Sequence, residues 1–122
     1  PFDKLPEYLS AADIIAIPQR RTSDSIGQIP ARLFDAMAMA KPILTTRISD
    51  IPEVLGGCGY LTEPNEPSQL ADVIQYILNH PDEAYKKGQT ARERCKQMYD
   101  MSNLESSLKK LIERVVVRKD LK

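Results

Sequence analysis

The segment from residue 29 to residue 46, IPARLFDAMAMAKPILTT, constrains the fold of this chain more than any other. Apolar residues recur at helical spacing through its first part, and small residues between them let a helix lie close to a neighbour. Pro30 suits the start of that helix, because a missing N–H costs nothing there. Lys41-Pro42 ends the helix, and residues 43–46 then form a predicted strand.

Two further apolar runs predict strands before and after this segment. Residues 14–17 are a continuous apolar run that ends at Pro18, and residues 58–62 form a short run after Gly56 and Gly57. Continuous apolar strands are typical of parallel sheets that are covered on both faces. Strand, helix and strand with short connections predict right-handed parallel crossovers. We therefore predict an α/β sheet flanked by helices, the later part of a doubly wound domain.

Helices make up the rest of the prediction. Residues 5–12 have amphipathic spacing, Pro67 and Pro81 each open a later helix, and Ser102 with Glu105 forms a capping box for the last one. The apolar faces predicted for these three later helices are, in chain order, Leu70, Val73, Ile74, Ile77, Leu78; Ala84, Gly88, Ala91, Cys95, Met98; and Leu104, Leu108, Leu111, Ile112, Val115.

Composition narrows the functional classes. A chain of 122 residues has room for one small domain, and its formal net charge of zero provides no global field toward nucleic acid or membrane. We find no signal peptide and no apolar run that reaches membrane-spanning length, so we expect a cytoplasmic protein. Cys58 and Cys95 fit no metal spacing and are predicted to be reduced packing residues. The chain begins in mid-pattern, so we expect a piece of a longer protein.

Asp35 is the first candidate for ligand binding. It lies near the amino end of the predicted helix, where unpaired backbone N–H groups and the helix dipole attract phosphate. Its carboxylate offers two acceptor oxygens to vicinal hydroxyls. A ligand with both hydroxyls and phosphates, such as a nucleotide sugar, fits this combination. The alternative is a charge that only stabilises its own helix, by roughly 0.3–1 kcal/mol.

The order of the motifs resembles the carboxyl-terminal domain of retaining glycosyltransferases of the GT-B fold, in the "group 1" family. That family reads, loosely, P-x-K-L-x-E-A-M-A-x-G-K-P, then T-x-x-G-G-x-P-E, then G-x-L-V-x-P. The resemblance spans nearly the whole chain, and the matching residues are Pro30, Leu33, Asp35, Ala36, Met37, Ala38, Lys41, Pro42, Pro52, Glu53, Gly59, Leu61, Pro64, Leu70 and Ala71.

The resemblance implies a Rossmann-like, three-layer parallel sheet flanked by helices. Residues 1–101 are then a partial donor-binding domain, and residues 102–122 a C-terminal helix that packs toward an absent amino-terminal domain. Asp35 takes the place of a glutamate that binds ribose hydroxyls. Arg32 stands where relatives often have lysine; its guanidinium suits bidentate binding of a diphosphate, and the alternative is an exposed helix arginine. The backbone N–H groups of Ala31 and Arg32, after Pro30, and those of Gly27 to Ile29 are the phosphate candidates.

Further candidates lie on neighbouring segments. Arg20 and Arg21 follow the strand at residues 14–17, where open α/β sheets bind ligands, although loop arginines are often only solvated. Thr45, and Thr46 after it, border the same edge or are strand formers with satisfied hydroxyls. Two residues depart from the family pattern beside the shorter Asp35: Gly27 replaces a second glutamate and Ala40 replaces a glycine.

By resemblance, the parent protein transfers a sugar from a nucleotide-diphosphate sugar to a hydroxyl acceptor with retention, and needs no metal or other cofactor. Its partners are the nucleotide sugar and the missing amino-terminal domain, with no nucleic acid and with membrane contact only through the parent. The isolated piece is expected to be inactive. A nucleotide-sugar epimerase, a degenerate non-catalytic GT-B-like module and self-association through an exposed sheet edge remain alternatives.

Overall fold

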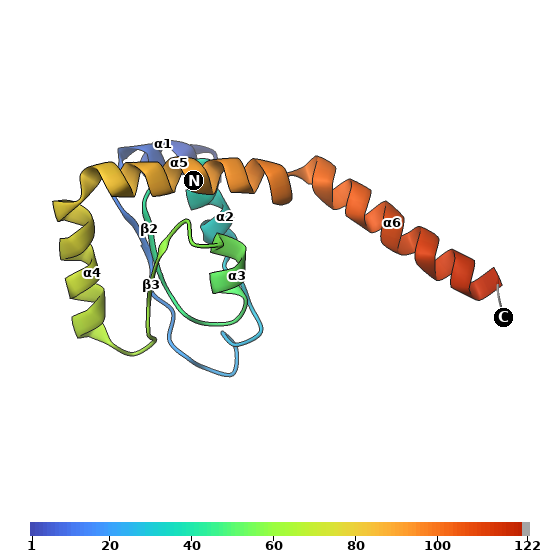
Figure 1. Ribbon diagram of the computed structural model, residues 1–122, viewed down its shortest axis with the longest axis horizontal. Coiled ribbons are helices and arrows are strands. Elements are labelled where there is room, and N and C mark those ends of the chain that lie inside the picture. Colours follow the sequence, from blue (N-terminus) through green and yellow to red (C-terminus); the bar gives the residue numbers. More distant parts are fainter. Residues whose placement is uncertain (121–122) are drawn as a thin grey trace.

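The computed structural model describes residues 1–120 and contains one three-stranded parallel sheet with helices around it (Figure 1). The strand order is β1-β2-β3, so β2 is central. The α/β class predicted from the sequence is confirmed. In chain order the elements are a 3₁₀ turn η1 (Phe2–Lys4), α1 (Leu5–Ala11), β1 (Ile15–Ile17), α2 (Ala31–Ala38), β2 (Ile43–Thr46), α3 (Ile51–Leu55), β3 (Tyr60–Thr62), α4 (Pro67–Asn79), α5 (Pro81–Met98) and α6 (Met101–Asp120).

The sheet is covered on both faces. Alternate residues of a strand point to opposite faces, and Ile43 and Leu44 of β2 accordingly belong to two different apolar clusters. The Ile43 cluster includes buried side chains of α2, α3 and α5, whereas the Leu44 cluster includes side chains of α4 and Ala84 at the start of α5. Figure 1 shows α4 on one side of the strands and α2 and α3 on the other. Burial on both faces explains why the strands have continuous apolar sequences.

The turn between α2 and β2 packs tightly against α5. Ala40 has a φ of 57°, in the left-handed region that favours glycine. A glycine, as in the family pattern, adopts this geometry without cost, whereas the alanine here is strained. On α5, a Cβ at Gly88 would overlap the carbonyl oxygen of Ala40. The small residues predicted on the buried face of α5 therefore allow the close approach.

Helix α3 is fastened to α5 at its carboxyl end. Gly56 ends α3 in the left-handed conformation, with φ 55°. The Arg94 guanidinium donates from Nε to the Val54 carbonyl at 2.8 Å and from Nη2 to the Glu53 carbonyl at 2.9 Å. The Glu53 side chain itself is exposed, so this residue contacts α5 through its backbone carbonyl.

Some predicted details of the later helices are wrong. No capping box forms at Ser102, because α6 begins at Met101 and the Asp100 carboxylate accepts the Met101 N–H at 2.8 Å and the Ser102 hydroxyl at 2.9 Å. Leu78 and Met98, predicted to be buried, are 58% and 50% exposed because they lie at helix ends beyond the sheet.

Helix α6 extends away from the rest of the molecule (Figure 1). Its predicted apolar face is present along the helix but joins neither apolar cluster of the sheet body within residues 1–120. Every member of that face is more than half exposed, at 59%, 52%, 57%, 54% and 59% for Leu104, Leu108, Leu111, Ile112 and Val115.

Candidate functional site

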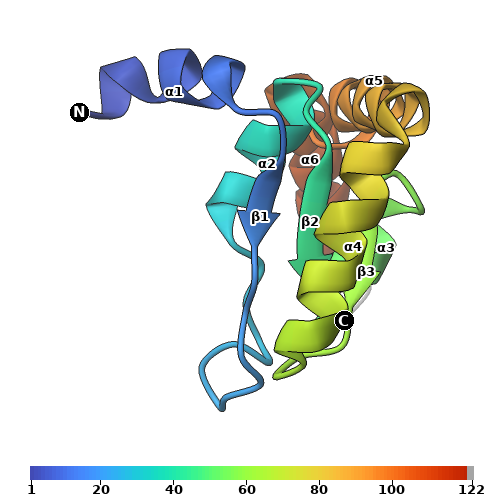
Figure 2. The same ribbon diagram turned by 90° about the vertical axis from the view of Figure 1, so that its left-hand side faces the viewer.

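The three strands end at one edge of the sheet, at Ile17, Thr46 and Thr62. Open parallel α/β sheets bind their ligands outside the carboxyl ends of the strands. Figure 2 shows the loop that joins β1 to α2 and the start of α4 at this edge, beyond the arrowheads. The predicted site residues before α2 and at its start therefore lie on the edge where a ligand is expected.

The amino end of α2 presents free backbone donors. Pro30 is the N-cap residue, with φ −63° and ψ 134°, and no side chain caps the helix. The first backbone bond of the helix runs from the Leu33 N–H to the Pro30 carbonyl at 3.0 Å. Within the part of the chain that the structure describes, the N–H groups of Ala31 and Arg32 make no hydrogen bond. Both residues are exposed, so an anion can reach these donors.

Asp35 lies in the second turn of α2 and is partly exposed. Its carboxylate makes no hydrogen bond or ion pair with any residue from 1 to 120. The charge of Asp35 affects Cys95 on α5. Burial raises the pKa of the Cys95 thiol, and the charges of Asp100 and Asp35 raise it further. Asp35 is therefore a free acceptor on the same helix as the free N–H groups.

The loop of residues 18–30 is organised by local contacts. The Ser25 hydroxyl donates to the Arg20 carbonyl at 2.6 Å, and the Thr22 N–H donates to the Ser25 hydroxyl at 2.9 Å. Arg20 and Arg21 are exposed, and neither forms an ion pair within the described residues. A Cβ built on Gly27 meets no atom within 4 Å, so a longer side chain at this position has room.

A cavity of about 330 Å³ lies at this edge, between the strand ends and the start of α4. Among the predicted site residues, Arg20 and Thr46 line this cavity, and none of those on α2 does. The structure thus divides the candidates into a group at the amino end of α2 and a group at the strand ends. The lining residues are Pro18, Gln19, Arg20, Thr46, Thr62, Glu63, Asn65, Glu66, Pro67 and Leu70.

Thr45 lies apart from both groups. Its side chain is fully buried, and its hydroxyl donates to the Ile17 carbonyl at 2.9 Å. This arrangement fits the alternative of a strand residue with a satisfied hydroxyl. Sequence reasoning missed Gln19, whose side-chain oxygen Oε1 is buried without a partner among the described residues. The residue has no distinctive sequence signal except its place directly after Pro18.

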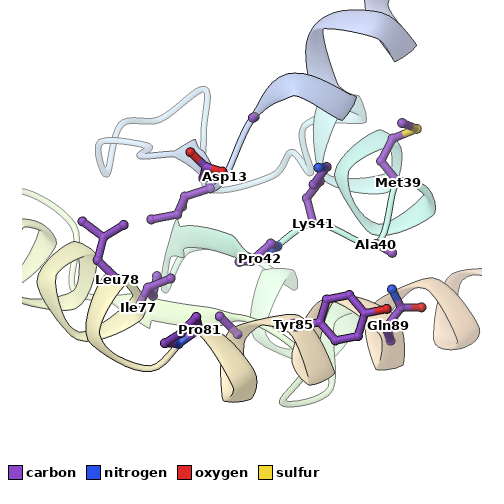
Figure 3. Close-up of a pocket in the computed structure, with 13 residues that line it drawn as sticks. Asp13, Met39, Ala40, Lys41, Pro42, Ile77, Leu78, Pro81, Tyr85 and Gln89 are labelled. Carbon is purple, nitrogen blue, oxygen red and sulfur yellow. The ribbon is translucent and has the colours of Figure 1, made fainter.

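A larger cavity of about 430 Å³ lies at the opposite edge, where β1 and β2 begin (Figure 3). Figure 3 shows its walls coming from the link between α1 and β1, the turn between α2 and β2, and the junction of α4 with α5. Lys41 in this wall donates to the Ser10 carbonyl at 2.7 Å, which ties α1 to the body. Because ligands of open α/β sheets bind at the carboxyl ends, we place the site at the other edge despite its smaller cavity.

The remaining reactive side chains have structural contacts. His80 joins α4 to α5 as the cap residue of both, and its ring stacks on Tyr76 with the centroids 3.9 Å apart. Cys58 and Cys95 are free thiols.

No cluster of three His, Cys, Asp or Glu side chains that could hold a metal ion occurs in residues 1–120. Over the same range, no helix is both long and apolar enough to cross a bilayer.

The fold and the site define a class: part of an open parallel α/β domain with an exposed, uncapped helix end at the carboxyl edge of its sheet. A family model described as "Glycosyl transferases group 1" matches residues 1–80. The chain belongs to this family of glycosyltransferases, as the resemblance predicted.

Two curated relatives illustrate the similarity. The chain is 24% identical over 119 residues to an MMP alpha-(1->4)-mannosyltransferase of Mycolicibacterium hassiacum, which covers 95% of this chain and 28% of that protein. It is 31% identical over 93 residues to an N-acetyl-alpha-D-glucosaminyl L-malate synthase of Bacillus anthracis, which covers 75% and 23% respectively. The chain thus spans about a quarter of the length of the curated relatives that it matches.

Solved structures show the same fold. A sucrose-phosphate synthase from Thermosynechococcus elongatus superimposes with a TM-score of 0.78 at 22% identity, over 91% of this chain and 27% of that one. Anabaena Alr3699/HepE, solved in complex with UDP-glucose, superimposes with a TM-score of 0.76 at 21% identity, over 89% and 29%. The Rossmann-like sheet of a GT-B carboxyl-terminal domain, predicted from the motifs, is therefore confirmed.

Proposed function

We propose that the parent of this chain transfers a sugar, of the hexosyl type, from a nucleotide-diphosphate sugar to a hydroxyl acceptor with retention at the anomeric carbon. In this proposal the chain holds part of the donor nucleotide. The Asp35 carboxylate accepts hydrogen bonds from ribose hydroxyls, and the N–H groups of Ala31 and Arg32 donate to the diphosphate. Arg32 adds its guanidinium as a second phosphate ligand.

The observation that carries the proposal is the uncapped, exposed amino end of α2 in a chain of this family. Free N–H donors attract the negative charge of a diphosphate through hydrogen bonds and the helix dipole, in the ground state and as charge develops on the leaving nucleotide. Asp35 lies one turn further along the same helix and has no partner of its own within the described residues. The pair of features matches the two chemical parts of a nucleoside diphosphate.

The remainder of the reaction lies outside this chain in the proposal. An amino-terminal domain of the parent supplies the acceptor site, and α6 packs its exposed apolar face on that domain. Residues 1–101 then act as the donor-binding part and residues 102–122 as the connection to the second domain; residues 121 and 122 lie outside the described part. We propose that the isolated chain is inactive for this reason and that the parent requires no metal.

The test is a calorimetric titration of the full-length parent with uridine, guanosine and adenosine diphosphates. We expect one of them to bind, and Asp35→Ala to weaken it about tenfold, which corresponds to roughly 1.4 kcal/mol. Asp72→Ala is the matched control, because Asp72 is an exposed acid in the second turn of α4 and does not line the cavity at this edge. Equal affinities for Asp35→Ala and the wild type would contradict the ribose role.

A degenerate, non-catalytic module is the second candidate. The absence of the second acidic residue at Gly27, together with the shorter Asp35, favours it. Such a module binds a nucleoside diphosphate no better than the monophosphate or the free nucleoside. The same titration, extended to those two ligands, therefore separates the candidates.

The isolated chain has an additional property to control. Within the described residues β1 pairs only with β2, so its other edge is unpaired. Unpaired strand edges associate with other chains. Dilution on a sizing column shows whether the fragment forms dimers that the full-length parent does not form.

A further inference from the structure

Thr46, the last residue of β2, holds the beginning of the loop that leads to α2. Its hydroxyl accepts the Gln19 N–H at 3.1 Å and donates to the Gln19 carbonyl at 3.1 Å. One side chain thus satisfies both backbone groups of Gln19. Thr46 is only 4% exposed and both bonds are partly buried, so water competes with them less than at the open surface.

The contact extends the β1–β2 pairing beyond the strands. Gln19 follows Ile15 and Ile17 at the two-residue period of a strand, so its backbone groups face β2. The main-chain pairing ends at Ile17, opposite Thr45. The hydroxyl of Thr46 then replaces the backbone of β2 as the partner, while the neighbouring Thr45 hydroxyl binds the Ile17 carbonyl. Two adjacent threonines therefore fix the point where the chain leaves the sheet.

Beyond this point the loop has no other such anchor. From residue 20 to residue 29, every hydrogen bond within the described part of the chain is internal to the loop. The next fixed point is Pro30, at the start of α2. The loop contains Arg20 and Arg21, and it ends at the start of α2, where the N–H groups of Ala31 and Arg32 are free. Thr46 is thus the only side chain outside the loop, among the described residues, that fixes its first half by hydrogen bonds.

We propose that Thr46 is a positioning residue of the donor site, which acts through Gln19 on the loop of residues 18–30 and touches no substrate itself. The proposal rests on the proposed function of the parent. Its physical content is that the hydroxyl, rather than the β-branched shape, is required at this position. Valine has the same shape but leaves the Gln19 N–H and carbonyl without their partner, and unpaired polar groups of this kind favour other loop positions.

Thr62 provides a matched control. It ends β3 as Thr46 ends β2, it is also 4% exposed, and it lines the same cavity of about 330 Å³. Its hydroxyl makes a long contact of 3.5 Å to the Thr45 carbonyl, within the sheet, and none to the loop. Thr62→Val therefore tests loss of a buried threonine hydroxyl at a strand end without loss of the loop contact.

The experiment compares Thr46→Val, Thr46→Ser and Thr62→Val in the full-length parent. We measure the affinity for the nucleoside diphosphate by calorimetry, and amide hydrogen exchange over residues 19–29. For Thr46→Val we expect faster exchange in this segment and a diphosphate affinity about tenfold weaker, because both hydrogen bonds that order Gln19 are lost. Thr46→Ser keeps the hydroxyl and restores both values, and Thr62→Val leaves the exchange of residues 19–29 unchanged.

Three results overturn the proposal. If Thr46→Val binds the diphosphate as the wild type does, the hydrogen bonds between Thr46 and Gln19 have no role in the site. If Thr46→Ser fails to restore binding, the shape of the side chain matters and not the hydroxyl. If Thr62→Val speeds exchange over residues 19–29 equally, the effect is general destabilisation. Should Thr46→Val not fold, Thr46→Ala against Thr46→Ser gives the same comparison. A wild-type parent that binds no diphosphate instead refutes the proposed function, and the positioning role with it.

Discussion

The sheet body and helix α6 have equally regular apolar patterns but opposite environments. Leu33, Met37 and Leu44 in the body are 0% exposed, whereas Leu108 and Leu111 on α6 are 52% and 57% exposed. Most helical stability in proteins comes from packing of the apolar face, so α6 gains little from the body to which it is joined. The body therefore has its own core, while α6 presents an apolar face that joins neither cluster of that core within residues 1–120.

The largest expected effect is a matched pair of leucine truncations in the isolated chain. Leu33→Ala empties a buried position of α2 and should lower the free energy of unfolding by about 2–5 kcal/mol. Leu108→Ala removes an exposed side chain of α6 and should change it by less than about 0.5 kcal/mol. Urea denaturation followed by circular dichroism measures both. Similar losses for the two variants would refute the contrast.

The same pair sharpens the comparison in the full-length parent. If α6 packs on the amino-terminal domain, Leu108→Ala becomes a core truncation and should lower stability by about 2 kcal/mol or more. The effect of Leu33→Ala should stay as it is in the fragment. The readout is the urea midpoint of the parent. An unchanged midpoint for Leu108→Ala would show that α6 remains unpacked there.

Next in size is the effect of the two hydrogen bonds from Arg94 of α5 to carbonyl groups of α3. Arg94→Met removes two hydrogen bonds to carbonyl groups while keeping the aliphatic stem, and should cost about 1–3 kcal/mol. Arg92→Met is the control, because Arg92 is exposed on the same helix. Thermal unfolding of the fragment should show a lower midpoint for the first variant only. Equal midpoints for the two variants would mean that the Arg94 hydrogen bonds do not stabilise the sheet body.

The smallest effect concerns the turn between α2 and β2. Ala40→Gly relieves the left-handed backbone at φ 57° and should raise stability by up to about 1 kcal/mol. Ala71→Gly, at an exposed interior position of α4, should lower it by about 0.5–1 kcal/mol. Opposite shifts of the unfolding midpoint are therefore expected from the same chemical change. A loss of stability for Ala40→Gly would contradict the strain assigned to this turn.

These contrasts show what local sequence pattern can predict. Apolar runs and prolines were sufficient to predict all three strands and the helices opened by Pro67 and Pro81, because strand and helix periods are local properties. The free amino end of α2 also followed from Pro30 and the small-residue pattern after it. The placement of α6 did not follow, since a periodic face indicates burial without naming the partner.

Contacts between distant residues were out of reach from one sequence. Thr46 is bonded to Gln19, and Arg94 to Val54, across many intervening residues, and nothing in the local pattern at either residue indicates the pairing. The start of α6 was missed for a different reason. Ser102 and Glu105 have the spacing of a capping box, but Asp100 is an equally good acceptor and comes two residues earlier. Where two caps compete, tertiary context decides.

The central claim is that the carboxyl edge of the sheet, and not the larger cavity at the amino edge, receives the donor nucleotide. Amide hydrogen exchange of the full-length parent, with and without the nucleoside diphosphate that binds, tests this claim most directly. We predict slower exchange over residues 18–32, which include the free N–H groups of Ala31 and Arg32. Slower exchange over residues 39–42 and 81–89, which border the cavity at the amino edge, would contradict it.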